Sequence, residues 1–136
     1  MNSFLDANRH VGIFLLRLFI GLRLFYGVID NVVSWEQMME FARFLTANDF
    51  PFPVLSAICS VYLQLLGSLM ILAGFKIRMA SLLMVANFII AVFFVHVKGG
   101  DSIEEMTPAL AMLFGCITFL FIGAERISID HYLESR

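Results

Sequence analysis

The sequence predicts an all-α integral membrane protein, a four-helix bundle with a short amphipathic interfacial helix between its first two membrane-spanning helices. Hydrophobic residues make up 60% of the 136 residues and charged residues 15%. Soluble domains average about 45–50% and about 25% for the same two classes. A soluble bundle of this length has too much surface to hide so many apolar side chains. We therefore expect residues 1–136 to form a single transmembrane domain in a lipid bilayer.

Four apolar runs, each close to the ~20 helical residues that cross a bilayer core, predict the spanning helices. They cover residues 11–33, 54–75, 79–97 and 107–124. Backbone groups in lipid must be hydrogen-bonded within their own segment, so each run is expected to be a helix. A proline-containing stretch at 48–53 and a short polar turn at 76–78 separate the first three runs. Pro108 lies in the first turn of the fourth, where proline is tolerated.

The connection at 35–48 has helical periodicity of its own. Its apolar positions are Trp35, Met38, Met39, Ala42 and Leu45, and its charged positions on another face are Glu36, Glu40 and Arg43. Such a pattern is typical of a helix that lies in the membrane interface. It could cap the bundle or act as a lid over a ligand site, and both interpretations remain open.

Lysine and arginine outside the runs predict the orientation of the chain. One side carries Arg9, Lys76, Arg78, Arg126 and Arg136, and the other carries only Arg43 and Lys98. Both termini are therefore expected in the cytoplasm, with the chain in the inner membrane. The two outer connections are acidic, and we expect Glu104 and Glu105 to approach Arg43 beside His96 at the outer mouth. The net charge of −2 leaves no basic face for nucleic acid.

Polar residues recur near the middle of the runs. Arg23 lies about 18 Å from the inner end at 1.5 Å per residue, where an arginine costs at least ~2.5–3.5 kcal/mol. It should therefore face the bundle interior and meet polar groups of other helices in one layer. The candidate ligand-binding residues are Arg23, Tyr26, Asp30, Gln64, Asn87 and Thr118. These groups could instead satisfy one another and only hold the bundle together.

Four further residues carry expectations of their own. Arg17 is near enough to the cytoplasmic end to snorkel to the headgroups, so it is expected to act as an anchor. His96 follows Asn87 by nine residues, which on an ideal helix points the two side chains in opposite directions. No second histidine shares its depth, which disfavours haem. Cys59 and Cys116 form no CxxC pair, so neither a disulfide framework nor a metal site is predicted, and both are expected to be buried.

Four stretches in order resemble the DoxX family: RLFIGLRLFYGVIDN, FPFPVLSA, QLLGSLMILAGFKIRMAS and GAERISIDHYL. The resemblance implies a four-helix membrane bundle. It also implies a link with redox chemistry, as a membrane subunit of quinone-reducing oxidoreductases such as the thiosulfate:quinone type. Two positions depart from the family pattern. Gln64 stands where many members carry glutamate, and Asp30–Asn31 replaces a lysine-type ending of the first helix.

Two functions from different classes follow. The chain could be a subunit of, or accessory to, a membrane oxidoreductase that binds a quinone-type ring between its helices. Arg23, Gln64 and Asn87 would then donate hydrogen bonds to a ring carbonyl. The sequence carries no flavin, haem or metal signature, so a partner protein would supply the redox centre, and enzymatic activity of this chain itself stays open. Alternatively the chain is a non-catalytic scaffold or chaperone-like membrane protein. Small-solute transport by a homo-oligomer is a third hypothesis.

Overall fold

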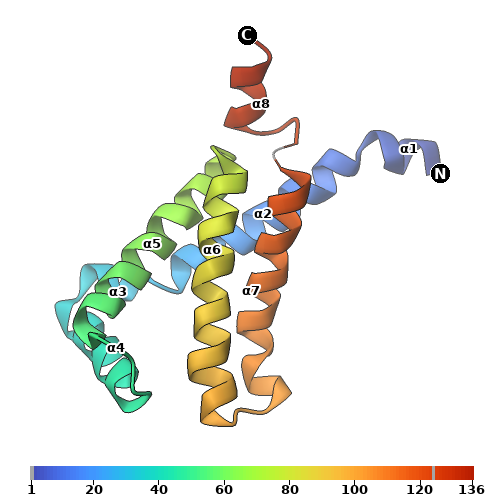
Figure 1. The fold of residues 1–136 in the computed structure, drawn as a ribbon. Helices are drawn as coiled ribbons and strands as arrows, with labels where there is room; N and C mark the ends of the chain where they lie inside the picture. The colour runs from blue at the N-terminus through green and yellow to red at the C-terminus, as the bar shows by residue number, and fades with distance from the viewer. Residues whose placement is uncertain (1, 124) are drawn as a thin grey trace.

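The computed structural model describes residues 2–123 and 125–136, and all its regular elements within these ranges are helices (Figure 1). In chain order they are α1 (Asn2–Ala7), α2 (Arg9–Tyr26), α3 (Ile29–Val33), α4 (Trp35–Ala47), α5 (Pro53–Ala73), α6 (Ile77–Ala91), the π-helix η1 (Val92–Val97), α7 (Ile103–Ile122) and α8 (Ile129–Glu134). The all-α prediction is confirmed.

Three helical stretches are long and apolar enough to cross a membrane: Pro53–Ala73, Ile77–Val97 and Ile103–Ile122. They correspond to the predicted runs 54–75, 79–97 and 107–124, of which the last residue, Ala124, lies outside the described residues. The last helix begins earlier than predicted, at Ile103, so Pro108 lies inside it and not in its first turn. The first predicted run, 11–33, is not one continuous helix. It breaks between α2 and α3 at Gly27 and Val28, since glycine and β-branched residues are weak helix formers.

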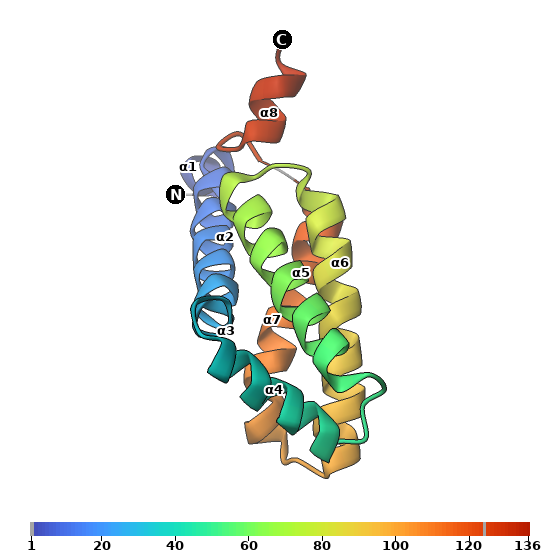
Figure 2. The ribbon, with the colours of Figure 1, turned by 90° about the vertical axis from the view of Figure 1, so that its left-hand side faces the viewer.

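The four long helices α2, α5, α6 and α7 pack around a shared core (Figure 2). Helix α2 contacts α5 and α7, and α6 contacts the same two helices. The core side chains are Ile20, Leu24, Ile71, Ile77, Ala80, Met84, Met112, Cys116 and Phe119. Gly67 lets α5 and α6 approach closely, because a Cβ there would lie 2.9 Å from Cε of Met84. Small residues at helix contacts are the usual means of close packing in membranes.

Helix α4 packs across the end of the bundle opposite the termini (Figures 1 and 2). Its side chains Met38, Ala42 and Leu45 are buried against Ala57 and Val61 of α5. The Ser34 hydroxyl accepts a hydrogen bond from the backbone N–H of Gln37 and caps the start of the helix. The predicted apolar face is therefore buried in its middle and end. Trp35, at its start, is 63% exposed instead.

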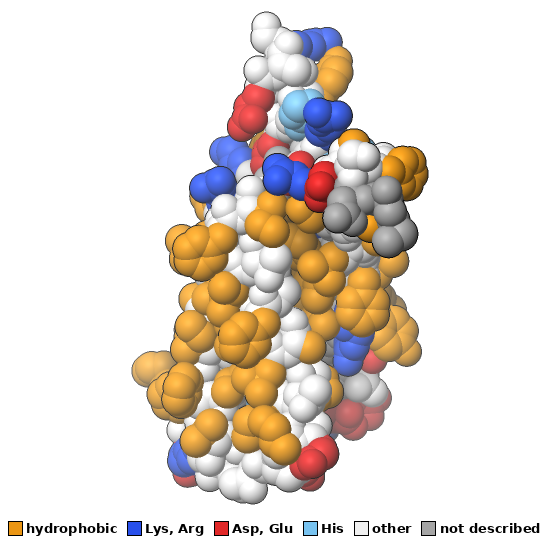
Figure 3. Space-filling model, turned by 90° about the vertical axis from the view of Figure 1, so that its right-hand side faces the viewer, with side chains coloured by type: hydrophobic (Ala, Val, Ile, Leu, Met, Phe, Trp, Pro, Cys, Tyr) orange, Lys and Arg blue, Asp and Glu red, His pale blue; other side chains and the backbone are white. Residues whose placement is uncertain are grey.

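The outer surface of the long helices is largely apolar. On the face drawn in Figure 3, hydrophobic side chains cover the middle of the molecule, and most lysine, arginine and acidic side chains lie toward its two ends. Leu22, Leu66 and Phe121 are 55%, 56% and 77% exposed. Continuous apolar patches of this extent mark a surface that is covered by lipid or protein, and this surface therefore supports a membrane location.

The C-terminal segment closes the end of the bundle that carries both termini. The Asp130 carboxylate accepts hydrogen bonds from the backbone N–H groups of Lys76 (2.7 Å) and Ile77 (3.0 Å) at the start of α6. The N–H of Asp130 donates to the carbonyl of Gly74 at 2.9 Å. Gly74 ends α5 with φ of +66°, a left-handed conformation that favours glycine. One residue thus ties the C-terminal segment to the turn between α5 and α6.

Arg17 belongs to the same junction, which differs from the expectation that it snorkels as an anchor. Arg17 is only 3% exposed, and its guanidinium donates a hydrogen bond to the backbone carbonyl of Ile127. The guanidinium also lies 5.4 Å from the ring centroid of Phe14. The C-terminal segment, 110 residues away in sequence, covers Arg17 and replaces the lipid headgroups as its partner.

We expect Asp130→Ala to destabilise the protein, because the substitution leaves two N–H groups at the start of α6 without their charged acceptor. The loss should be about 1–3 kcal/mol, which lowers the melting temperature in detergent by several degrees. Asp6→Ala, on exposed α1, is the matched control and should melt with the parent protein. Equal melting temperatures for Asp130→Ala and the parent would contradict this account of the junction.

Candidate functional site

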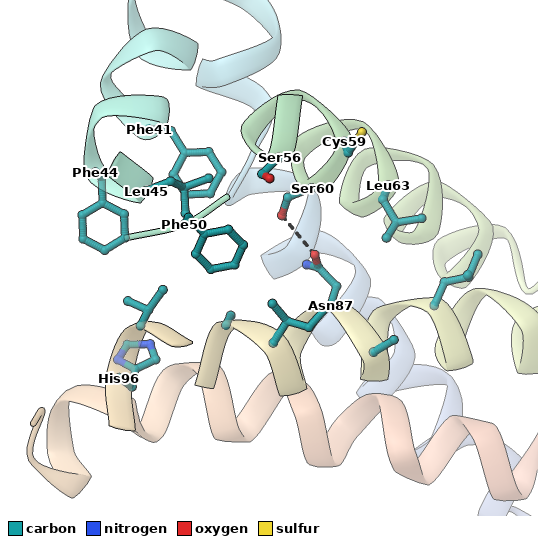
Figure 4. Close-up of a pocket in the computed structure, with 15 residues that line it drawn as sticks. Phe41, Phe44, Leu45, Phe50, Ser56, Cys59, Ser60, Leu63, Asn87 and His96 are labelled. Carbon is teal, nitrogen blue, oxygen red and sulfur yellow. Dashed lines mark hydrogen bonds between the residues drawn. The ribbon is translucent and has the colours of Figure 1, made fainter. Parts of the chain in front are cut away.

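A cavity of about 470 Å³, here called the α4–α6 cavity, lies between α4, α5 and the α6–η1 stretch (Figure 4). Its wall is mainly apolar and aromatic. The lining residues are Phe41, Phe44, Leu45, Phe50, Ser56, Cys59, Ser60, Leu63, Leu83, Ala86, Asn87, Ile90, Ala91, Val95 and His96. Of the predicted ligand-binding residues, only Asn87 is in this set. Cys59, expected to be buried, is exposed and lines the cavity, whereas Cys116 is buried in the core.

Asn87 is held in place by a serine of the neighbouring helix. The Ser60 hydroxyl donates to Oδ1 of Asn87 at 3.0 Å, as Figure 4 shows. An asparagine amide offers one oxygen acceptor and two N–H donors. With the oxygen engaged by Ser60, the amide nitrogen is the group that Asn87 can offer to a ligand in the cavity. This pair is therefore a fixed hydrogen-bond donor inside a mostly apolar pocket.

His96 lines the same cavity as Asn87, which corrects the expectation that the two side chains point in opposite directions. The expectation assumed an ideal α-helix. The structure has a π-helix at Val92–Val97, which closes i→i+5 hydrogen bonds and holds more residues in each turn. The side chains after Ala91 are thereby rotated relative to α-helical positions. Single π-turns occur often at functional sites.

Asp101 fixes the orientation of the His96 ring. Its Oδ2 lies 2.6 Å from Nδ1 of His96, and its backbone N–H donates to the His96 carbonyl at 3.0 Å. A carboxylate only accepts hydrogen bonds, so Nδ1 carries the proton. In the neutral ring Nε2 is then the acceptor. His96 also lines a second pocket, which makes it the wall shared by both cavities.

The connection after α4 contacts the segment around η1 near the α4–α6 cavity. The Lys98 ammonium donates to Oδ2 of Asp49 at 2.9 Å and to the carbonyl of Asn48 at 3.2 Å. The rings of Phe50 and Phe94 meet edge to face with centroids 5.5 Å apart. The outer connections thus lie together, as the sequence predicted, but through residues other than those expected.

The expected partners at the mouth are engaged elsewhere or lie at the surface. Arg43 is exposed, and no ion pair joins it to Glu104 or Glu105 among the described residues. The Glu105 carboxylate accepts from the backbone N–H of Ser102 at 2.8 Å and completes a capping box at the start of α7. Helix capping therefore accounts for the position of Glu105.

A second pocket of about 420 Å³, here called the α2–α7 pocket, opens between α2, α5 and α7. Its polar lining residues are Arg23, Gln64, His96 and Glu105, and the others are Phe19, Leu24, Gly27, Phe88, Pro108, Ala109, Ala111 and Met112. The Gln64 amide donates to the carbonyl of Leu24 at 3.0 Å. Arg23, expected to face the bundle interior, is exposed instead, because it lies in the last turn of α2 at the edge of this pocket. The single polar layer expected from the sequence is also divided: Arg23 and Gln64 line one pocket, and Asn87 lines the other.

The remaining predicted residues line neither pocket. Tyr26 is 72% exposed, and Asp30 is exposed on α3, beyond the helix break. The Thr118 hydroxyl donates to the carbonyl of Phe114 within its own helix at 2.9 Å. Residues that sequence reasoning did not place at a site include the aromatic group Phe41, Phe44 and Phe50 and the histidine partner Asp101. A histidine and an aspartate five residues apart across a diglycine turn were the available signal.

The helices and cavities described here define an integral membrane protein with ligand-sized space between its helices. The chain belongs to the DoxX family, whose model matches residues 12–97. That match covers the chain from near the start of α2 to the end of η1, and it confirms the family resemblance drawn from the sequence motifs. No curated protein and no solved structure matches the chain.

The His96–Asp101 pair predicts one ring tautomer. In the parent protein, ¹⁵N NMR of the histidine side chains at a pH where His96 is neutral should show a protonated Nδ1 and an unprotonated Nε2. Asp101→Ala removes the acceptor and should shift the ring toward the Nε2-protonated form. Asp49→Ala, which breaks the neighbouring ion pair with Lys98, should leave the tautomer unchanged. An Nε2-protonated ring in the parent would refute the assignment.

Proposed function

We propose that this chain is a membrane subunit of, or accessory protein to, a membrane oxidoreductase, and that it binds a quinone-type ring in the α4–α6 cavity. The observation that supports the proposal is the make-up of this cavity. Small-molecule sites typically enclose about 300–1,000 Å³ and combine apolar or aromatic walls with a few placed polar groups. The cavity of about 470 Å³ meets both conditions.

Within this proposal, Asn87 binds one ring carbonyl through its amide N–H. Ser60 holds the amide oxygen at 3.0 Å and thereby keeps the nitrogen available. Phe41, Phe44 and Phe50 supply flat apolar surface against which a ring can stack. His96 follows Asn87 by nine residues, about 13 Å along a helix, so one carbonyl does not reach both. Arg23 and Gln64, expected from the sequence to bind this ring, line the α2–α7 pocket instead.

The electron-carrying centre then belongs to a partner protein, as the family resemblance implies. The chain contributes the ring-binding cavity and its apolar surroundings. The lid interpretation of α4 fits this role, because Phe41, Phe44 and Leu45 of α4 form one side of the cavity. Movement of α4 would therefore change access to Asn87. A homo-oligomer is compatible with the same arrangement.

We further propose that α2 is the fourth membrane-spanning helix, that α4 lies in the outer interface, and that both termini face the cytoplasm of a cell with this protein in its inner membrane. Helix α2 has 18 residues, about 27 Å at 1.5 Å per residue, and it packs beside α5 and α7. Both termini lie at the same end of the bundle (Figure 1). The excess of lysine and arginine on that side supports a cytoplasmic position.

Cysteine labelling in intact cells tests this topology. In a background with Cys59→Ala and Cys116→Ala, the variants Ser3→Cys and Ser135→Cys should resist a membrane-impermeant maleimide until the cells are opened. Ser102→Cys, in the turn before α7, should be labelled from outside and serves as the matched control. External labelling at residue 3 or 135 would contradict the orientation.

Ligand binding tests the proposed function itself. The protein, purified in mild detergent, should bind decylubiquinone saturably. Asn87→Leu should weaken binding about tenfold, the loss expected for one buried hydrogen bond. Thr118→Val, which lies at a similar depth outside both pockets, should bind like the parent protein. Absence of saturable binding, together with co-purification of diverse membrane proteins, would favour the scaffold or chaperone-like function instead.

A further inference from the structure

The α2–α7 pocket contains charged groups that the proposed quinone site does not use. We propose that this pocket binds the headgroup of an aminophospholipid of the phosphatidylethanolamine class from the outer leaflet. The phosphate would pair with Arg23, and the primary ammonium would pair with Glu105. The proposal does not depend on quinone binding, because it concerns a different cavity, whose Arg23 and Glu105 do not line the first.

Arg23 supplies the cationic part of the pocket. Its Nη1 and the Gln64 Nε2 each lie 3.2 Å from the position that a Cβ would occupy at Gly27. The guanidinium therefore folds back along α2 toward its C-terminal end, and it converges with the Gln64 amide over a residue without a side chain. No described carboxylate forms an ion pair with Arg23. Arg23 is exposed in the last turn of α2, which leaves its N–H donors open to a ligand, and a phosphate offers several oxygens to such donors.

Glu105 supplies the anionic part of the pocket. One of its oxygens accepts from Ser102, which leaves the other oxygen for a ligand. A carboxylate oxygen is an acceptor for a primary ammonium. Glu105 lies in the first turn of α7, beside Pro108 and Ala109 of the same pocket.

The order of these groups along the bundle matches the order of groups in a phospholipid. From the outer end inward, α7 contributes Glu105 and then Met112. On the facing side, Gly27, directly after α2, precedes Arg23 and Phe19 of that helix. Along the pocket the lining is therefore first acidic, then basic and then apolar. A phospholipid places its ammonium, its phosphate and its acyl chains in the same order. Because the pocket carries one cation and one carboxylate, a zwitterionic headgroup is complementary to it, whereas a purely anionic one would leave Glu105 unpaired.

Lipid titration of the delipidated full-length protein tests the proposal. Native mass spectrometry would compare short-chain phosphatidylethanolamine, phosphatidylglycerol and phosphatidylcholine. We expect phosphatidylethanolamine to bind at least about tenfold more tightly than either of the others, the size of one charged hydrogen bond. Phosphatidylglycerol has no amine, and the trimethylated amine of phosphatidylcholine cannot donate a hydrogen bond. Equal binding of all three, or preference for phosphatidylglycerol, would overturn the proposal.

Variants test whether the lipid binds in the α2–α7 pocket. Arg23→Gln should weaken phosphatidylethanolamine binding about tenfold, and Glu105→Gln, which retains the capping geometry, should abolish the preference over phosphatidylglycerol. Gly27→Ala should weaken binding without changing any charge, because its methyl group displaces Arg23 and Gln64. The controls Arg43→Gln and Glu104→Gln remove the same charges outside the pocket. Parent-like selectivity in both Arg23→Gln and Glu105→Gln, or equal losses in the controls, would place the lipid elsewhere. Quinone binding, measured on the same samples, is expected to persist in these variants.

Discussion

The hydrogen bonds of the Asp130 carboxylate to the start of α6 hold together one end of this bundle. They join a segment 54 residues distant to the turn that separates α5 from α6. Arg17 joins α2 to the same segment through the Ile127 carbonyl. In an apolar environment, a backbone N–H or a guanidinium without a partner is costly. The positions of α2, α5 and α6 at this end are therefore fixed by polar groups that have few other partners.

At the opposite end α5 and α6 diverge, and the Lys98–Asp49 ion pair and the Phe50–Phe94 contact join the neighbouring connections there. Figure 1 shows α5 and α6 close together at their connecting turn and far apart at their other ends, with α4 placed near the open side. The half of α5 nearest the turn contains the buried residues Gly67, Ser68 and Ile71. The other half lines the α4–α6 cavity through Ser56, Ser60 and neighbouring residues. Close packing therefore lies at the end where a short turn joins α5 to α6, and the cavity lies where the two helices diverge.

Much of the fold could be predicted from the sequence, because helix formation in apolar runs depends on neighbouring residues. The run boundaries near Pro53 and the turn at 76–78 agree with the helix ends. The candidate site was less predictable, since it depends on how each helix is rotated. Depth along the membrane placed Arg23, Gln64 and Asn87 at one level, but depth does not tell which neighbour each side chain faces. The division of these residues between two pockets is decided by packing.

Two individual residues show the limits of reasoning from local pattern. Arg17 was expected at the headgroups because it lies near the cytoplasmic end of its run. It is buried instead by a segment 110 residues away, which local sequence does not reveal. His96 was expected to point away from Asn87 because a periodicity of 3.6 was assumed, whereas Val92–Val97 form a π-helix. Neither burial by a segment distant in sequence nor a change from α-helix to π-helix can be recognised from composition. Both affect the cavities directly, since His96 lies between them.

The most direct test of the account is an experimental structure of the protein crystallised from a lipid mesophase that contains decylubiquinone. The account predicts ring density in the α4–α6 cavity, with one ring oxygen within hydrogen-bond distance of the Asn87 amide nitrogen and the ring against the phenylalanines of α4. A cavity closed by direct packing of α4 on α6, or ring density in the α2–α7 pocket beside Arg23, would contradict it.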